Sequence, residues 1–170
     1  GGATFAAFPR WYASLFSGFY LPLFLMLMAL IVRGVAFEFR SKDANLRWRS
    51  TWDWAIFIGS FVPALLWGVA FSNFVRGVAI DANQNIVGSF FDLLNPYALI
   101  GGMAAVAVFI LHGSIFLVLK TEDPVSEEAR RIGWKVWIAT LVITSSYVVY
   151  SYFATDILNK LGVNPGPIPI

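Results

Sequence analysis

The 170-residue chain has no cysteine, a single histidine and few charged residues. Without cysteine it can form no disulfide, thiolate metal site or cysteine nucleophile. Charged residues make up 13% of the chain, whereas roughly 25% is typical of soluble domains, and 58% of the residues are hydrophobic. The net charge of +2 is too small to favour nucleic acid as a partner. The composition therefore indicates a membrane protein.

Four long intervals carry no charge at all. They are 22, 22, 27 and 20 residues long and cover residues 11–32, 54–75, 93–119 and 136–155. Because a helix rises about 1.5 Å per residue, about 20 residues cross the roughly 30 Å hydrocarbon core of a bilayer. We therefore predict an all-α, polytopic membrane protein: a bundle of four transmembrane helices with an N-terminal helical stub, in one membrane domain over residues 1–170.

The predicted spans have approximate bounds, and each pair is separated by a polar segment. The spans cover about residues 11–36, 54–76, 96–120 and 132–156. Charged connectors are expected at about residues 37–53 and 121–131. A hairpin or a short surface excursion, with a turn at DANQN, is expected within 76–95. The last ten residues contain three prolines and are predicted to be extended.

Particular residues shape these spans. Pro22 is expected to kink the first span, and Pro63 lies near the middle of the second. The third span begins with GGMAA, whose small residues suit tight helix packing. Ser126 with the following acidic pair predicts a helix start, and a tyrosine cluster near the end of the fourth span is typical of a membrane interface.

The longest densely charged segment is 33–54. It holds five of the twelve basic residues, three of the ten acidic residues and three of the seven tryptophans. With the border residues counted, the two charged connectors hold nine basic residues, against three on the opposite side. Basic residues are retained in the cytoplasm. The bias predicts cytoplasmic connectors and places both ends of this chain on the outer face.

Glu38 is a candidate for proton handling at the end of the first span. It lies between Phe37 and Phe39, and burial there would desolvate its carboxylate and raise its pKa. The alternative is a solvated charge at a helix end. Arg33 and Arg40 are its basic neighbours, with a structural or orienting role.

His112 lies deep in the third span, so it is a second proton-path candidate. A packed or hydrogen-bonding role is the alternative that we favour. A single histidine, no cysteine and three scattered methionines make haem ligation by this chain alone poorly supported, and no metal site is predicted.

Two aspartates lie at the starts of spans. Asp53, between Trp52 and Trp54, is expected to cap or orient the second span, and the two tryptophans are expected to anchor it. Asp92 is expected to do the same for the third span, with a proton-path role as the alternative. No catalytic triad, phosphate loop or carboxylate pair is present, so we predict no catalytic residue in this chain.

Long ordered strings in the chain resemble one known family. They are AAFPRWYASLFSGFY, RGVAFEFRSK, RWRSTWDWAIFIGSFVP, WGVAFSNFVRGV and GSFFDLLNPYAL. They closely resemble subunit II of the cytochrome bd-type quinol oxidases, from residue 1 to about residue 120 and more loosely beyond. The acidic position of the FEFR motif corresponds to Glu38.

The resemblance implies a function for the whole complex. In that family two subunits form a membrane heterodimer that oxidises quinol and reduces oxygen to water, with protons taken from the cytoplasm. Subunit I holds the haems, of b and d type. Subunit II binds no haem, supports subunit I and is thought to help deliver protons. A small third subunit and membrane lipid are further expected partners, in the cytoplasmic membrane of a prokaryote.

The resemblance also implies a longer protein. The family's subunit II is about twice this length, with about nine spans, so this chain is expected to be a fragment that lacks the first helices and the C-terminal half. A secondary transporter or channel half, with helices broken at Pro22 and Pro63, is the alternative function. A purely structural membrane scaffold is a third.

Overall fold

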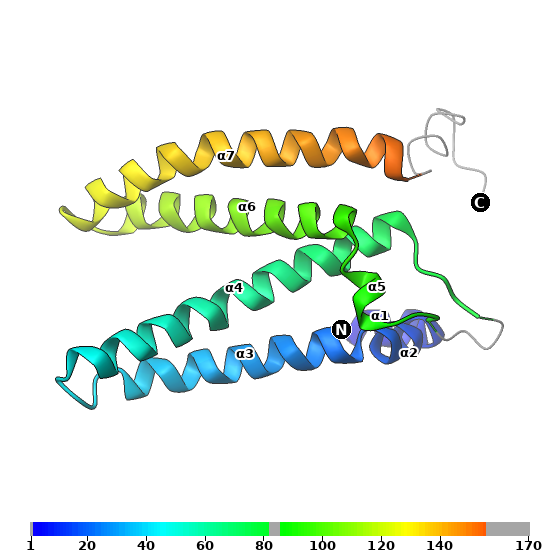
Figure 1. Ribbon diagram of the computed structural model, residues 1–170, viewed down its shortest axis with the longest axis horizontal. Helices are drawn as coiled ribbons and strands as arrows, with labels where there is room; N and C mark the ends of the chain where they lie inside the picture. Colours follow the sequence, from blue (N-terminus) through cyan, green and yellow to red (C-terminus); the bar gives the residue numbers. More distant parts are fainter. Residues whose placement is uncertain (1, 82–85, 156–170) are drawn as a thin grey trace. The chain divides into compact units, whose positions relative to one another are not determined.

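The structure is a computed structural model that describes residues 2–81 and 86–155 (Figure 1). Apart from one antiparallel β-bridge between Ile80 and Ile86, the regular elements of these residues are all helices. The helices are α1 (Gly2–Ala7), α2 (Pro9–Gly18), α3 (Tyr20–Phe39), α4 (Leu46–Arg76), α5 (Phe90–Leu93), α6 (Pro96–Lys120) and α7 (Val125–Ala154). The predicted all-α class is confirmed.

Four of the helices are long and apolar enough to cross a bilayer. They are α3, α4, α6 and α7, with 20, 31, 25 and 30 residues. At about 1.5 Å per residue even the shortest spans about 30 Å. Each of the four predicted spans therefore overlaps one of these long helices, and α1 supplies the predicted N-terminal stub.

The described residues form two compact units. The first, unit 1, contains residues 2–67, 78–81 and 86–93, and the second, unit 2, contains residues 68–77 and 94–155. Helix α4 contributes its first part to unit 1 and its last part to unit 2.

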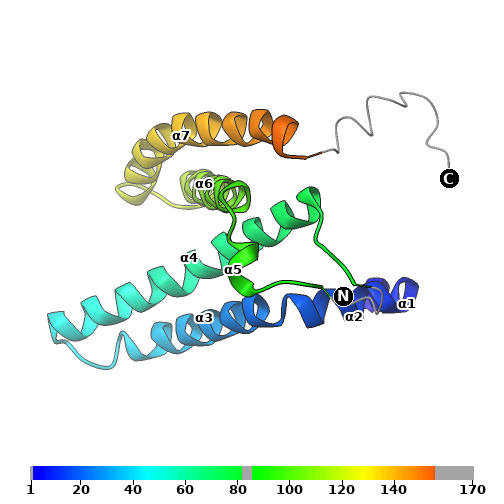
Figure 2. The same cartoon turned by 45° about the vertical axis from the view of Figure 1, so that its right-hand side comes forward.

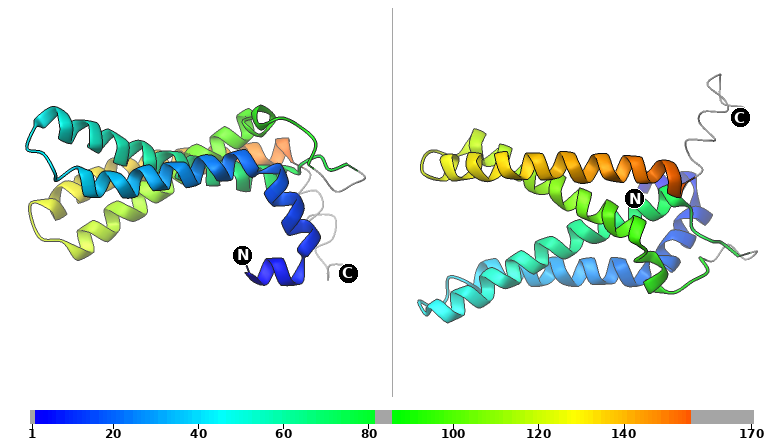
Figure 3. Two further views of the ribbon diagram at one scale, coloured as in Figure 1. Left: turned by 90° about the horizontal axis from the view of Figure 1, so that it is seen from below. Right: turned by 45° about the horizontal axis from the view of Figure 1, so that its top comes forward.

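In unit 1 the predicted span 11–36 is two helices rather than one kinked helix. The break lies at Phe19, and α2 turns sharply away from the axis of α3 (Figure 3). Pro22 is the third residue of α3, so the break at Phe19 lies within the turn before it, where proline cannot donate to the carbonyl of Gly18. The first-turn N–H groups of a helix have no intrahelical partner, so a proline at this position costs no hydrogen bond.

Helices α3 and α4 are joined by a short connector (Figure 2). Only residues 40–45 of the predicted connector 37–53 are outside these helices. The connector ends where Asn45 Oδ1 accepts a hydrogen bond from Arg47 N at 2.9 Å, which satisfies one of the free donors at the start of α4. The helix therefore extends about two turns beyond the uncharged segment that begins at Trp54.

The predicted hairpin within 76–95 is present on both sides of its turn. Val87 N donates to Ala79 O at 2.9 Å, next to the bridge between Ile80 and Ile86. Gly77, with φ of +89°, allows the chain to leave α4. Most of the predicted DANQN turn, residues 82–85, lies outside the described residues.

Unit 2 is built on α6 and α7, which lie side by side (Figure 1). Helix α6 begins at Pro96, and the side chain of Asn95 accepts a hydrogen bond from Ala98 N at 3.0 Å. A methyl group placed on Gly68 of α4 would lie 2.7 Å from both Gly102 Cα and Ala105 Cβ. The small residues at the start of α6 thus allow the predicted close packing.

Helix α7 starts earlier than the predicted span 132–156. Its first residue is Val125, and Glu127 and Glu128 lie in its first turn, where acidic side chains stabilise the helix dipole. Only residues 121–124 of the predicted connector 121–131 are outside helices. The predicted extended tail, residues 161–170, lies outside the described residues.

Candidate functional site

The charged segment between α3 and α4 is closed by an ion pair. The guanidinium of Arg40 donates from Nε to Asp53 Oδ1 and from Nη2 to Asp53 Oδ2, the second at 3.3 Å. Asp53 is therefore not the cap of α4, because it lies in the eighth position of that helix. Its role is to tie α4 to the end of α3.

The ion pair also affects the charge of Asp53, which precedes the uncharged part of α4. The hydrogen bond from Arg40, with the positive charges of Arg40 and Arg49, holds the pKa of the Asp53 carboxyl below its usual value. Asp53 therefore stays ionised near neutral pH.

Aromatic side chains reinforce the same junction. Trp48 Nε1 donates to Phe39 O at 2.9 Å, and the ring of Trp52 lies 5.5 Å from that of Phe39 and 5.6 Å from that of Trp48. Trp52 Nε1 is buried, with no hydrogen-bond partner among the described residues. Trp54 packs on Phe57 and is 62% exposed, as suits an interfacial anchor.

Glu38 is not desolvated in this chain. Its side chain is 76% exposed and lies 3.6 Å from the ammonium group of Lys42, one helical turn later. The flanking Phe37 and Phe39 are themselves exposed. Of the two alternatives given for Glu38, the described chain therefore matches the solvated charge at a helix end, because neighbours in sequence point to different sides of a helix and do not enclose it. Arg33 instead stacks over Phe37, with 5.7 Å from Cζ to the ring centre.

His112 is exposed on the surface of α6. The favoured packed role is thus not found within the described residues. In the described part of the chain no three His, Cys, Asp or Glu side chains are grouped to hold a metal ion.

Asp92 stabilises α5 rather than α6. Its Oδ2 accepts a hydrogen bond from Ser89 N at 2.6 Å, and Ser89 Oγ accepts one from Phe91 N at 3.3 Å. This reciprocal pair is a capping box. The expectation that Asp92 caps the third span is wrong, since Asn95 performs that role for α6.

A cluster of four hydroxyl groups, the hydroxyl cluster, lies inside unit 2 and was not predicted. It consists of Ser72 on α4, Tyr97 on α6, and Tyr147 and Ser151 on α7. The Tyr97 hydroxyl lies 3.0 Å from that of Tyr147 and 2.9 Å from Ser151 Oγ, and Tyr147 donates to Ser72 Oγ at 3.1 Å. The cluster therefore links three helices by side chains.

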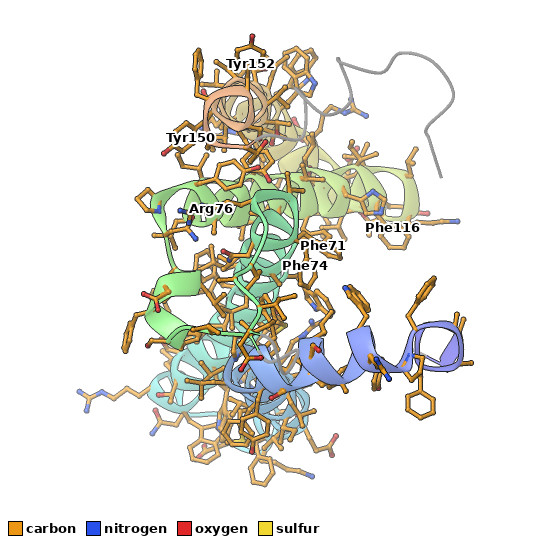
Figure 4. The ribbon with its side chains drawn as sticks, turned by 90° about the vertical axis from the view of Figure 1, so that its right-hand side faces the viewer. Phe71, Phe74, Arg76, Phe116, Tyr150 and Tyr152 are labelled. Carbon is orange, nitrogen blue, oxygen red and sulfur yellow. The ribbon has the colours of Figure 1, made fainter. Side chains whose placement is uncertain are left out.

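Tyr147 was assigned by sequence to an interfacial belt together with its neighbours. In the structure only two of these three tyrosines pack against α6. The Tyr147 ring stacks on Tyr97 at 5.1 Å, and Tyr150 also packs on Tyr97 at 5.7 Å, whereas Tyr152 is 59% exposed and points away from α6 (Figure 4). The i, i+4 spacing of Tyr147 and Ser151 was the available signal, since it places both hydroxyls on one face of a helix.

The hydroxyl cluster ends on backbone carbonyls. Ser72 Oγ donates to Gly68 O and Ser151 Oγ donates to Tyr147 O, both at 2.8 Å. Since the four hydroxyl groups carry four protons, at most four of these five contacts are made at any one time with one acceptor per proton. These contacts hold α4, α6 and α7 together within unit 2.

Tyr97→Phe is expected to lower the free energy of unfolding by about 1 kcal/mol, because it removes two hydrogen bonds yet leaves Tyr147 and Ser151 with other acceptors. Denaturant titration in detergent measures this change. The exposed Tyr152→Phe is the control and should change nothing. In the assembled protein a fall in activity for Tyr97→Phe without a fall in stability would contradict the packing role.

Comparison with known proteins decides the family. The model of the family described as "Cytochrome bd terminal oxidase subunit II" matches residues 1–169. The chain belongs to this family. The resemblance inferred from sequence strings is therefore confirmed, and the family is consistent with a multi-pass membrane protein.

Individual proteins that are similar to this chain support the same family. The chain is 38% identical over 169 residues to "Cytochrome bd ubiquinol oxidase subunit 2" of Bacillus subtilis, which covers 99% of this chain and 50% of that protein. It is 41% identical to "Cytochrome bd-I ubiquinol oxidase subunit 2" of Escherichia coli, over 92% of this chain and 42% of that protein. It is 46% identical to the "Probable cytochrome oxidase subunit 2" of Haemophilus influenzae, over 84% of this chain and 39% of that protein. The chain spans half or less of the length of these relatives.

Proposed function

We propose that the chain is part of the haem-free subunit of a bd-type quinol:oxygen oxidoreductase in a prokaryotic respiratory chain. In this proposal it supports a haem-bearing partner subunit in the cytoplasmic membrane. The observation that carries the proposal is the family match over residues 1–169. The names of the relatives, which describe subunit 2 of ubiquinol oxidases, support it.

The helix geometry favours this function over a transporter. The alternative rested on helices broken at Pro22 and Pro63. Pro22 lies in the first turn of α3, and α4 continues as one helix through Pro63. Both α3 and α4 therefore continue as helices beyond these prolines, whereas a transporter site of that kind needs an unwound segment at the midplane.

The exposed faces of the helices suit a subunit that packs against lipid and a partner. Along α7 the large apolar side chains of Trp134, Leu141, Val148 and Phe153 are 51–77% exposed. Apolar surface of this extent is typical of an interaction or membrane face.

The test is to purify the intact complex from cells that express its whole operon and to record a reduced-minus-oxidised spectrum. We expect haem to co-purify with the full-length subunit and to give haem bands in this spectrum, and we expect the preparation to show quinol oxidase activity. A colourless preparation that transports a solute would overturn the proposal.

For proton delivery we propose Glu38 as the uptake group at the water-exposed end of α3. Its exposure gives bulk water direct access to the carboxylate, which lies 3.6 Å from the Lys42 ammonium. His112 and Asp92 stay predictions for the same path.

Glu38→Gln in the complete complex is expected to lower oxidase turnover on the order of tenfold, less than the ~10²–10⁴ of a group that transfers a proton in the chemical step. Assembly, measured as haem per complex, should stay unchanged. Glu128→Gln is the matched control, because Glu128 is a 63% exposed carboxylate that pairs with Arg131 at 3.8 Å. Equal turnover in the two variants would show that Glu38 is a solvated helix end.

A further inference from the structure

A groove, here named the connector groove, lies between α6 and α7 at the end where their connector joins them. It has a volume of about 340 Å³, within the roughly 300–1,000 Å³ of ligand sites. Its wall is almost entirely apolar, with Ile115, Val118 and Leu119 from α6 and Trp134 and Trp137 from α7. Such a wall suits a hydrocarbon chain.

One charged side chain lies in this wall. It is Arg130, which is exposed and makes no ion pair among the described residues. The neighbouring Arg131 is paired with Glu128 at 3.8 Å. Arg130 is therefore the one charged residue in the lining of the groove, and its guanidinium is a group that binds phosphate through parallel hydrogen bonds.

The position of the groove matches the headgroup level of a bilayer. Helix α6 ends at Lys120 and α7 begins at Val125, so the chain leaves the membrane at this end. The indoles of Trp134 and Trp137 are 68% and 47% exposed, and indoles prefer the interface between lipid and water.

The charges around the groove indicate how it would attract an anion. Between Lys120 and Lys135 there are as many acidic residues as basic ones, so no broad positive field surrounds the site. Attraction of an anion must then act through contact with Arg130. A protein helix laid into the groove would instead bury this guanidinium, which is costly without a paired charge.

We propose that the connector groove binds one anionic phospholipid. The phosphate lies against the Arg130 guanidinium, and an acyl chain lies along the apolar wall formed by α6 and α7. This site is separate from the proposed oxidase activity and does not depend on it.

The test uses the full-length subunit in its intact complex, purified in mild detergent and examined by native mass spectrometry. The complex is first stripped of lipid and then titrated with phosphatidylglycerol. We expect one tightly retained phosphatidylglycerol, with affinity reduced about five-fold or more in Arg130→Gln. Arg130→Lys should largely keep the lipid, because it keeps the charge.

Arg131→Gln is the matched control, since it removes an equal charge one residue away and outside the groove. It should leave lipid retention unchanged. Inorganic phosphate should not compete, because it has no chain to fill the apolar wall. Equal retention in Arg130→Gln and wild type, retention of a neutral lipid in place of the anionic one, or a groove that keeps no lipid would each overturn the proposal.

Discussion

Gly101→Ala is expected to lower the free energy of unfolding by about 2–4 kcal/mol. A methyl group at this position of α6 would collide with Ser72 Oγ and lie 2.8 Å from Cε2 of Tyr147. Overpacking of this kind costs about 1–3 kcal/mol, and the displaced hydrogen bond between Tyr147 and Ser72 adds about 1 kcal/mol. Denaturant titration of the full-length protein in detergent measures the loss.

Gly113→Ala is the control on the same helix. A methyl group there meets nothing within 4 Å. Alanine is a better helix former than glycine by up to about 1 kcal/mol, so this variant should be neutral or slightly stabilised. If Gly101→Ala behaves like Gly113→Ala, α6 does not pack against Ser72 and Tyr147 as described.

Gly59→Ala is expected to destabilise unit 1 by about 1–3 kcal/mol. The added methyl on α4 would lie 2.7 Å from Ala29 O and 2.8 Å from Arg33 Cβ, both on α3. Since Ala29 O is a backbone atom of a helix, the clash is relieved only by moving α3 and α4 apart. The loss of their junction should also appear as faster proteolysis between Arg40 and Asn45.

The control for unit 1 is Gly34→Ala on α3, where a methyl group meets nothing within 4 Å. Both substitutions add one methyl group. Gly34→Ala adds it at an open position of α3, and Gly59→Ala adds it at a close-packed position of α4. Similar proteolysis rates and unfolding energies for Gly59→Ala and Gly34→Ala would contradict the close approach of α3 and α4.

The spans could be predicted because they depend on local composition. Twenty or more residues without charge cannot remain in water as an isolated segment, so charge-free intervals locate membrane helices whatever their neighbours are. The same reasoning placed the helix ends less well. Asn45 and the acidic first turn of α7 extend α4 and α7 beyond the uncharged segments, because a helix continues until its end groups find other partners.

Family membership was also readable, because ordered strings such as RGVAFEFRSK carry it without any knowledge of the fold. The roles of single residues within those strings were not. The sequence left open whether Glu38 is desolvated by its neighbours or is a solvated helix end, and the structure shows that it faces water beside Lys42. Asp53 was expected to cap a helix and instead pairs with Arg40.

Contacts between helices need the rotation of each helix about its axis. In soluble proteins a polar face reveals that rotation, but α6 is apolar on nearly all sides, and its sequence does not say which face meets α4 or α7. The hydroxyl cluster of Ser72, Tyr97, Tyr147 and Ser151 is therefore visible only once the helices are packed. The sequence by itself therefore determines the number of spans and the family. The partners of the side chains depend on the rotation of each helix about its axis, and a helix that is apolar on nearly all sides does not define that rotation.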